Sequence, residues 1–104
     1  MAGVPLSKET KWRVDILFDS GDADIVTKIL TDECGTNLPF CENLGPQELE
    51  RIRFAALKVS AGNLPRLREA VRLGKQDWRD LLVAAAFANN VQAHREWIPQ
   101  KPNS

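Results

Sequence analysis

Three stretches of this 104-residue chain repeat one turn between two apolar segments, and this recurrence limits the folds open to the chain. They cover residues 12–30, 53–71 and 80–98, and their central pairs are Gly21-Asp22, Gly62-Asn63 and Asn89-Asn90. Gly or Asn tolerates the left-handed conformation that ends a helix, and an Asp or Asn directly after it can accept backbone N–H bonds and start the next helix. Each stretch is therefore predicted to form an αα-hairpin.

The second half of each stretch carries one apolar helical face. After the turn, apolar residues occupy the first, fourth and eighth positions, with a single polar exception. The matched sets are Ala23, Val26 and Leu30; Leu64, Leu67 and Val71; and Val91, His94 and Ile98. Because His94 takes the place of Val26 and Leu67, we expect a histidine at the edge of the core rather than a catalytic acid or base.

Flanking signals extend this pattern to an all-α fold of five or six short helices stacked as αα-hairpins. Pro46 and Pro65 suit first helical turns, Gly74 is expected to end a helix, and Asp77 is expected to start the next one. The predicted helices cover about residues 10–20, 22–32, 46–60, 63–73, 77–88 and 90–98. They form one domain over residues 7–98, with mobile tails at 1–6 and 99–104.

Residues 12–18 also allow a second interpretation. Trp12, Val14, Ile16 and Phe18 alternate with charged or other residues, as they do in a half-buried strand. No second run of this kind exists to pair with it, and a lone strand leaves its backbone groups without partners. We therefore favour the helix over a sheet completed by a dimer.

The turns also resemble a known family. SGDADIVTKIL and AGNLPRLREAV are similar to the turn and second helix of ankyrin-type repeats, although the spacing of the copies and the missing Thr-Pro-Leu-His signature depart from that family. The resemblance covers about half the chain. It implies a degenerate helical repeat that binds other proteins and has no catalytic residues to carry over. The whole chain also looks like a small bacterial protein, which adds no function.

Composition excludes several other classes. No apolar run is long enough to span a membrane, and the first residues lack the apolar stretch of a secretory signal, so we expect a cytoplasmic protein. Two cysteines, Cys34 and Cys41, with one distant histidine do not complete a zinc site, so no metal and no cofactor are expected. We interpret both cysteines as free thiols, with a disulfide between them as the alternative under oxidation.

Charge is balanced overall but divided along the chain. Residues 15–50 hold nine acids against Lys28, whereas residues 51–79 hold eight basic residues against Glu69 and Asp77. One interpretation is that these are solvated faces with weak surface pairs. The functional interpretation is an exposed basic stripe on the helix at 63–75 that recognises an acidic partner or phosphates. Its members are Arg66, Arg68, Arg72 and Lys75.

The remaining candidates favour structural roles. The acid pairs Asp22 with Asp24 and Asp77 with Asp80 lie at predicted helix starts, where capping and the helix dipole favour acids. The tryptophans are expected mainly in the core, with a partly exposed binding surface as the alternative; they are Trp12, Trp78 and Trp97. Phe40, beside Pro39 in the insertion at 32–46, is the apolar residue we expect to anchor a partner.

These observations predict a non-enzymatic module for protein–protein interaction. Its partner-binding residues are Phe40, Arg66, Arg68, Arg72 and Lys75, and its partner is another, acidic protein. The alternative function is binding of a nucleic acid or phosphate ligand through the helix at 63–75, although the stripe contains no aromatic residue to stack on bases. A head-to-tail contact between copies, joining acidic to basic ends, is a further alternative.

Overall fold

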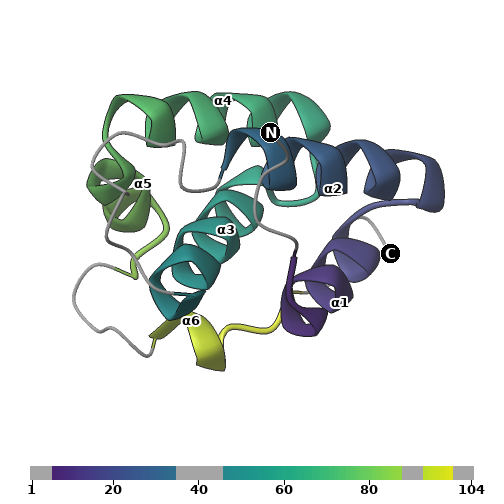
Figure 1. The fold of residues 1–104 in the computed structure, drawn as a ribbon, viewed down its shortest axis with the longest axis horizontal. Coiled ribbons are helices and arrows are strands. Elements are labelled where there is room, and N and C mark those ends of the chain that lie inside the picture. The colour runs from purple at the N-terminus through teal and green to yellow at the C-terminus, as the bar shows by residue number, and fades with distance from the viewer. Residues whose placement is uncertain (1–5, 35–45, 88–92, 100–104) are drawn as a thin grey trace.

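Helix α3 (Pro46–Ser60) runs through the middle of the fold, and helices on several sides pack against it (Figure 1). We analysed a computed structural model, which describes residues 6–34, 46–87 and 93–99. The other helices are α1 (Lys8–Leu17), α2 (Ser20–Glu33), α4 (Leu64–Gln76), α5 (Trp78–Ala84) and α6 (Ala93–Glu96). Over these ranges the chain has six helices and no strand, so the predicted all-α class is confirmed, and residues 12–17 lie in a helix rather than in a strand.

The centre of α3 is apolar on nearly every side because it is covered from nearly every side. The run from Ile52 to Leu57 is buried without interruption, and α3 contacts α1, α4, α5 and α6. A helix with apolar residues all round is typical of an interior position rather than of a surface. The exception within the run is Arg53, whose Nε donates to the backbone oxygen of Cys34 at 3.0 Å.

The turn between α3 and α4 follows the sequence prediction. Gly62 has a φ of 80° and Ala61 a φ of 51°, so two successive residues adopt the left-handed conformation. Asn63 then caps α4, because its side-chain oxygen accepts the N–H of Arg66 at 3.0 Å. Pro65 falls in the first turn of α4, where its missing N–H costs nothing.

The first of the three predicted turns is wrong in detail. Gly21 and Asp22 lie inside the first turn of α2, which begins at Ser20 with Asp19 at the N-cap position. Phe18 ends α1 in an extended conformation, so no left-handed residue is needed there. The third pair, Asn89-Asn90, lies outside the described residues.

Two helix ends also differ from the prediction. Gly74 does not end a helix: it is buried within α4, and a Cβ added to it would lie 3.2 Å from a methyl group of Leu81 on α5. The lack of a side chain therefore lets α4 and α5 approach each other. Helix α5 ends at Ala84, earlier than expected, because Ala86 adopts a φ of 63° and turns Phe87 into the core.

The tryptophans are less buried than expected. Trp12 is 47% exposed, which contradicts the expected core position, since it lies on the outer side of α1. Trp78 and Trp97 are partly buried against the core. Among the helices described, none has the length and apolar composition needed to cross a bilayer.

Replacing Gly62 by Val tests the turn between α3 and α4. At a φ of 80° a β-branched side chain collides with the backbone, so the free energy of unfolding should fall by about 1 kcal/mol or more. Gly21→Val is the matched control, because a Cβ at Gly21 meets no atom within 4 Å. Urea unfolding measures both variants, and an equal effect of the two substitutions would contradict the turn.

Candidate functional site

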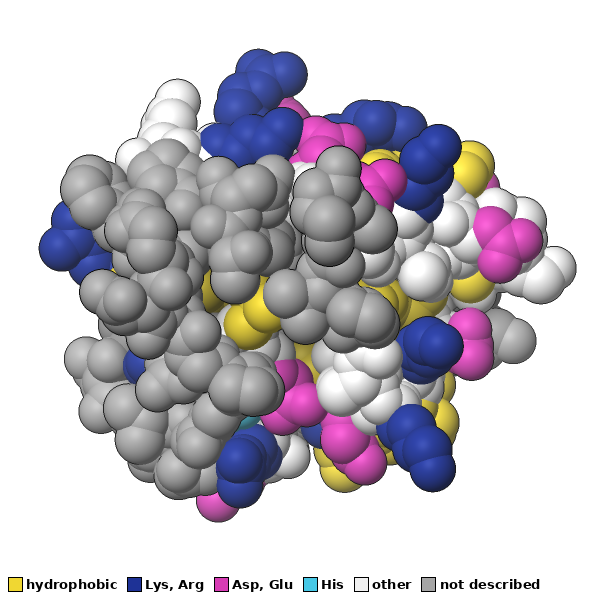
Figure 2. Space-filling view, viewed as in Figure 1, with side chains coloured by type: hydrophobic (Ala, Val, Ile, Leu, Met, Phe, Trp, Pro, Cys, Tyr) yellow, Lys and Arg dark blue, Asp and Glu magenta, His cyan; other side chains and the backbone are white. Residues whose placement is uncertain are grey.

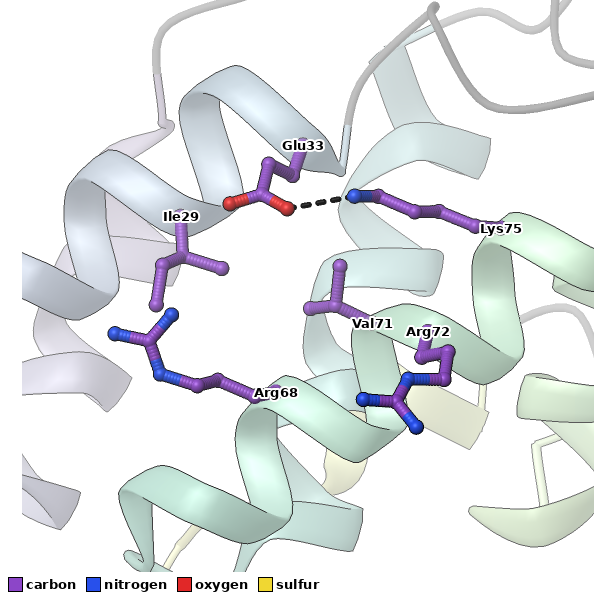
Figure 3. A pocket seen from close by; sticks show the side chains of 6 residues that line it. All are labelled: Ile29, Glu33, Arg68, Val71, Arg72 and Lys75. Atoms are coloured by element: carbon purple, nitrogen blue, oxygen red, sulfur yellow. Dashed lines mark hydrogen bonds and ion pairs between the residues drawn. The ribbon is translucent and has the colours of Figure 1, made fainter.

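A groove of about 260 Å³ lies between α2 and α4, where most of the predicted basic stripe is found (Figure 3). Arg68, Arg72 and Lys75 contribute from α4, one helical turn after another. Glu33, the last residue of α2, and Ile29, one turn before it, form the facing side. Val71 and Ile29 are buried and form the apolar floor.

Among the described residues, an ion pair is found for one of the three cations that line this groove. Lys75 Nζ lies 2.6 Å from Glu33 Oε1, and Figure 3 marks this ion pair at one end of the groove. Arg68 extends from α4 toward α2 beside Ile29, and Arg72 follows it one turn later. Both arginines are exposed, and within residues 6–34, 46–87 and 93–99 neither makes an ion pair or a side-chain hydrogen bond. The groove therefore carries two cationic groups beyond what its one carboxylate neutralises.

The surface of the molecule also carries basic side chains near α4. Figure 2 shows Lys and Arg side chains along the edge of the molecule where Figure 1 places α4, with a few acidic side chains beside them. Of the predicted stripe, the structure brings together Arg68, Arg72 and Lys75. Arg66 is exposed on α4 but does not line the groove. Phe40, the predicted apolar anchor, lies outside the described residues.

Most other basic residues of the 51–79 segment are engaged within the fold. Arg51 donates to the backbone oxygen of Phe87, and the ammonium of Lys58 lies 4.9 Å from the centre of the Phe87 ring. Arg53 is buried, and this burial lowers the pKa of its guanidinium. Several basic residues of this segment thus contact other parts of the fold, and few remain exposed without such a contact among the described residues.

Arg79 is neutralised locally at the start of α5. Its Nη2 lies 2.8 Å from Asp77 Oδ2, and its Nε donates to Asp77 Oδ1 at 2.9 Å. The side-chain hydrogen bonds from Arg79 are the main cause that lowers the pKa of the Asp77 carboxyl group. Asp77 also accepts the backbone N–H of Arg79, so it caps α5 as the sequence predicts.

A second hollow, of about 320 Å³, lies where α1, α3 and α6 meet, and sequence analysis did not find it. Its lining includes Glu9, Arg13, Glu50 and Arg95 around the ring of Phe54. Arg13 is only 3% exposed, and its guanidinium stacks on the Phe54 ring at 4.1 Å. The signal that Arg13 is special is absent from the sequence, because its importance comes from tertiary contacts with Phe54 and with Trp97, which is 84 positions away.

The innermost charges of this second hollow satisfy one another. Arg13 Nη1 lies 3.1 Å from Glu9 Oε1, and Arg13 Nη2 donates to the backbone oxygen of Trp97 at 3.1 Å. Ser7 donates to Glu50 Oε2 at 2.8 Å, while the other oxygen of Glu50 lies 3.7 Å from His94 Nε2. These contacts join α1, α3 and the chain around α6, so this cluster holds the fold together.

His94 belongs to this structural cluster. It is fully buried, and its ring packs against Phe54 and Phe87 with centroids 5.4 and 6.4 Å away. This burial agrees with the expectation that His94 is a core residue. Cys34 is also buried, whereas Cys41 lies outside the described residues, so the predicted state of the two thiols stays a prediction.

Arg13→Met tests whether this cluster anchors the C-terminal segment. Methionine keeps an apolar stem but cannot donate to the Trp97 oxygen, so the free energy of unfolding should fall by about 1–3 kcal/mol. Hydrogen exchange of the backbone amides at 94–98 should accelerate more than exchange in α4. Arg66→Met is the control, because Arg66 is exposed and its side chain makes no ion pair or hydrogen bond with any residue that the structure describes. Unchanged protection at 94–98 would contradict this anchoring role.

The groove between α2 and α4 is therefore the site best suited to a ligand, since it combines exposed, uncompensated cations with an apolar floor. Comparison of the chain with models of protein families, with curated proteins and with solved structures finds no match.

Proposed function

We propose that this protein is a non-enzymatic interaction module that binds an acidic segment of another protein in the groove between α2 and α4. The observation that carries the proposal is the pair Arg68 and Arg72, which are exposed at the groove and have no acidic partner among the residues that the structure describes. Guanidinium groups form bidentate hydrogen bonds with carboxylates, and such bonds add both affinity and geometric specificity.

The lining of the groove supports a protein ligand over a nucleic acid. Its side chains are Ile29, Glu33, Arg68, Val71, Arg72 and Lys75, with no aromatic ring on which a base can stack. A polypeptide can place carboxylates on the two arginines and an apolar side chain over Ile29 and Val71, which matches the chemistry of the lining.

The stacked-hairpin architecture and its ankyrin-like resemblance belong to the same proposal. Two observations support them. Helices α3 and α4 are joined by only three residues and pack against each other. The matched positions Val26, Leu67 and His94 of the three stretches are all fully buried. A degenerate helical repeat of this kind presents its exposed helix faces to a partner, and the groove lies on such a face.

Charge reversal in the groove tests the function directly. The probe is a fluorescein-labelled peptide in which glutamates flank single leucines, measured by fluorescence polarisation at low ionic strength. Arg68→Glu should weaken binding at least about tenfold, because it places like charges opposite each other. Arg66→Glu makes the same change on the same helix outside the groove, so it should leave affinity within about twofold.

The competing functions give different results in the same assay. A single-stranded oligonucleotide that binds more tightly than the peptide, and loses binding with Arg68→Glu, would replace this proposal with the nucleic-acid function. Equal weakening by Arg66→Glu and Arg68→Glu would show nonspecific attraction to charge and would contradict the groove. Sedimentation of the unlabelled protein at increasing concentration tests whether a second copy is the occupant instead.

A further inference from the structure

The ion pair between Glu33 and Lys75 occupies one end of the groove although it is poorly placed to stabilise α2. Glu33 is the last residue of α2, where the helix dipole disfavours a negative charge, and no basic residue lies in the last turn of that helix. Lys75 lies in the last turn of α4, where a positive charge is favourable. The negative charge of Glu33 is thus neutralised from another helix, since Lys75 Nζ lies 2.6 Å from Glu33 Oε1.

Both members of this pair remain accessible to solvent. The side chains of Glu33 and Lys75 are 44% and 47% exposed, so water and ions screen their attraction. Exposed pairs of this kind contribute little net stability. A carboxylate arriving from a partner at Lys75 therefore exchanges one exposed ion pair for another of similar strength, so it adds little net affinity.

The spacing of the cations defines what such a partner carries. Arg68 and Arg72 are four residues apart on α4, and Lys75 follows three residues later, so the three residues start from one row of backbone positions on this helix. The row is about 10 Å long, at 1.5 Å of rise per residue. A helical segment with carboxylates at positions i, i+4 and i+7 presents its charges at the same spacing. Two of these carboxylates meet arginines that have no ion pair within the described part of the chain, and the third meets a lysine that already holds Glu33.

We propose that Glu33 is an internal competitor for Lys75, and that it limits the groove to two of the three carboxylates of an acidic helical segment. This inference rests on the proposed function, because it concerns the same groove and the same class of partner. While Glu33 stays on Lys75, the third carboxylate adds little affinity. When Glu33 is removed, all three carboxylates of the partner find a cation.

The test compares two helical peptides on the wild-type protein and on Glu33→Gln. One peptide carries glutamates at i, i+4 and i+7, and the other has glutamine at i+7. Wild-type protein should bind the two peptides with affinities within about twofold. Glu33→Gln should bind the peptide with three glutamates about three- to tenfold more tightly than the wild type does, with little gain for the other. In Lys75→Gln combined with Glu33→Gln, this gain should disappear.

The possible outcomes distinguish the role of Glu33 from the role of the groove. Equal gains for both peptides would reflect a general increase in positive charge and would overturn the role of Glu33 as a competitor. No gain for either peptide, with binding still lost in Arg68→Glu, would overturn this inference and leave the proposed function standing. Loss of discrimination between Arg68→Glu and Arg66→Glu would instead reject the groove itself. Glu33→Ala repeats the measurement without the amide, and circular dichroism verifies that each variant is folded.

Discussion

Burial of α3 is the constraint on which the rest of this structure depends. Ile52, Phe54 and Leu57 are at most 1% exposed, and four other helices contact the helix that carries them. A small domain has little apolar material to spare, so a helix that is covered all round uses much of it. The remaining helices must each leave one face in water, and their charged residues gather on those faces.

The charged residues around Arg13 and those in the groove between α2 and α4 differ in burial, because α3 is covered differently at the two places. Toward α1 and α6, the guanidinium of Arg13 is buried within the fold and has partners there, since it donates to both Glu9 and the Trp97 backbone oxygen. Removing such a buried group leaves its partners unsatisfied, so its role is stability. At the edge formed by α2 and α4, Arg68 and Arg72 are exposed to solvent, and no described group depends on them for a hydrogen bond or an ion pair. Charges of the second kind contribute little to folding and are available for recognition.

The edge formed by α2 and α4 also explains how a chain with equal numbers of acidic and basic residues can have a locally basic surface. Lys and Arg equal Asp and Glu in number over the whole sequence, so net charge favours neither an acidic nor a basic partner. Folding makes the surface charge uneven, because it pairs some basic residues with acidic ones and buries others. Arg79 is held by Asp77, Arg53 is buried against Cys34, and only part of the basic segment reaches the groove. The surface potential is thus a product of packing rather than of composition.

Local signals in the sequence predicted much of the secondary structure. Asn63 and Asp77 cap the helices that follow them, and Gly62 is left-handed, because capping and backbone strain depend on a few adjacent residues. The same kind of signal failed at Gly74, since a glycine can serve close packing as well as helix ending. It also failed at Ala86, where burial of Phe87 stabilises a left-handed alanine that local preference disfavours.

The basic stripe was predicted as a face of one helix, and this was sufficient to name Arg68, Arg72 and Lys75. The sequence by itself determined the helical class, the caps at Asn63 and Asp77 and the side of α4 on which these residues lie, because all three depend on neighbours within one or two turns. Only the tertiary structure decided that α2 packs beside α4, that Glu33 holds Lys75, and that Arg66 stands outside the groove. These facts depend on contacts between residues more than forty positions apart, which hydrophobic burial selects and local patterns do not encode.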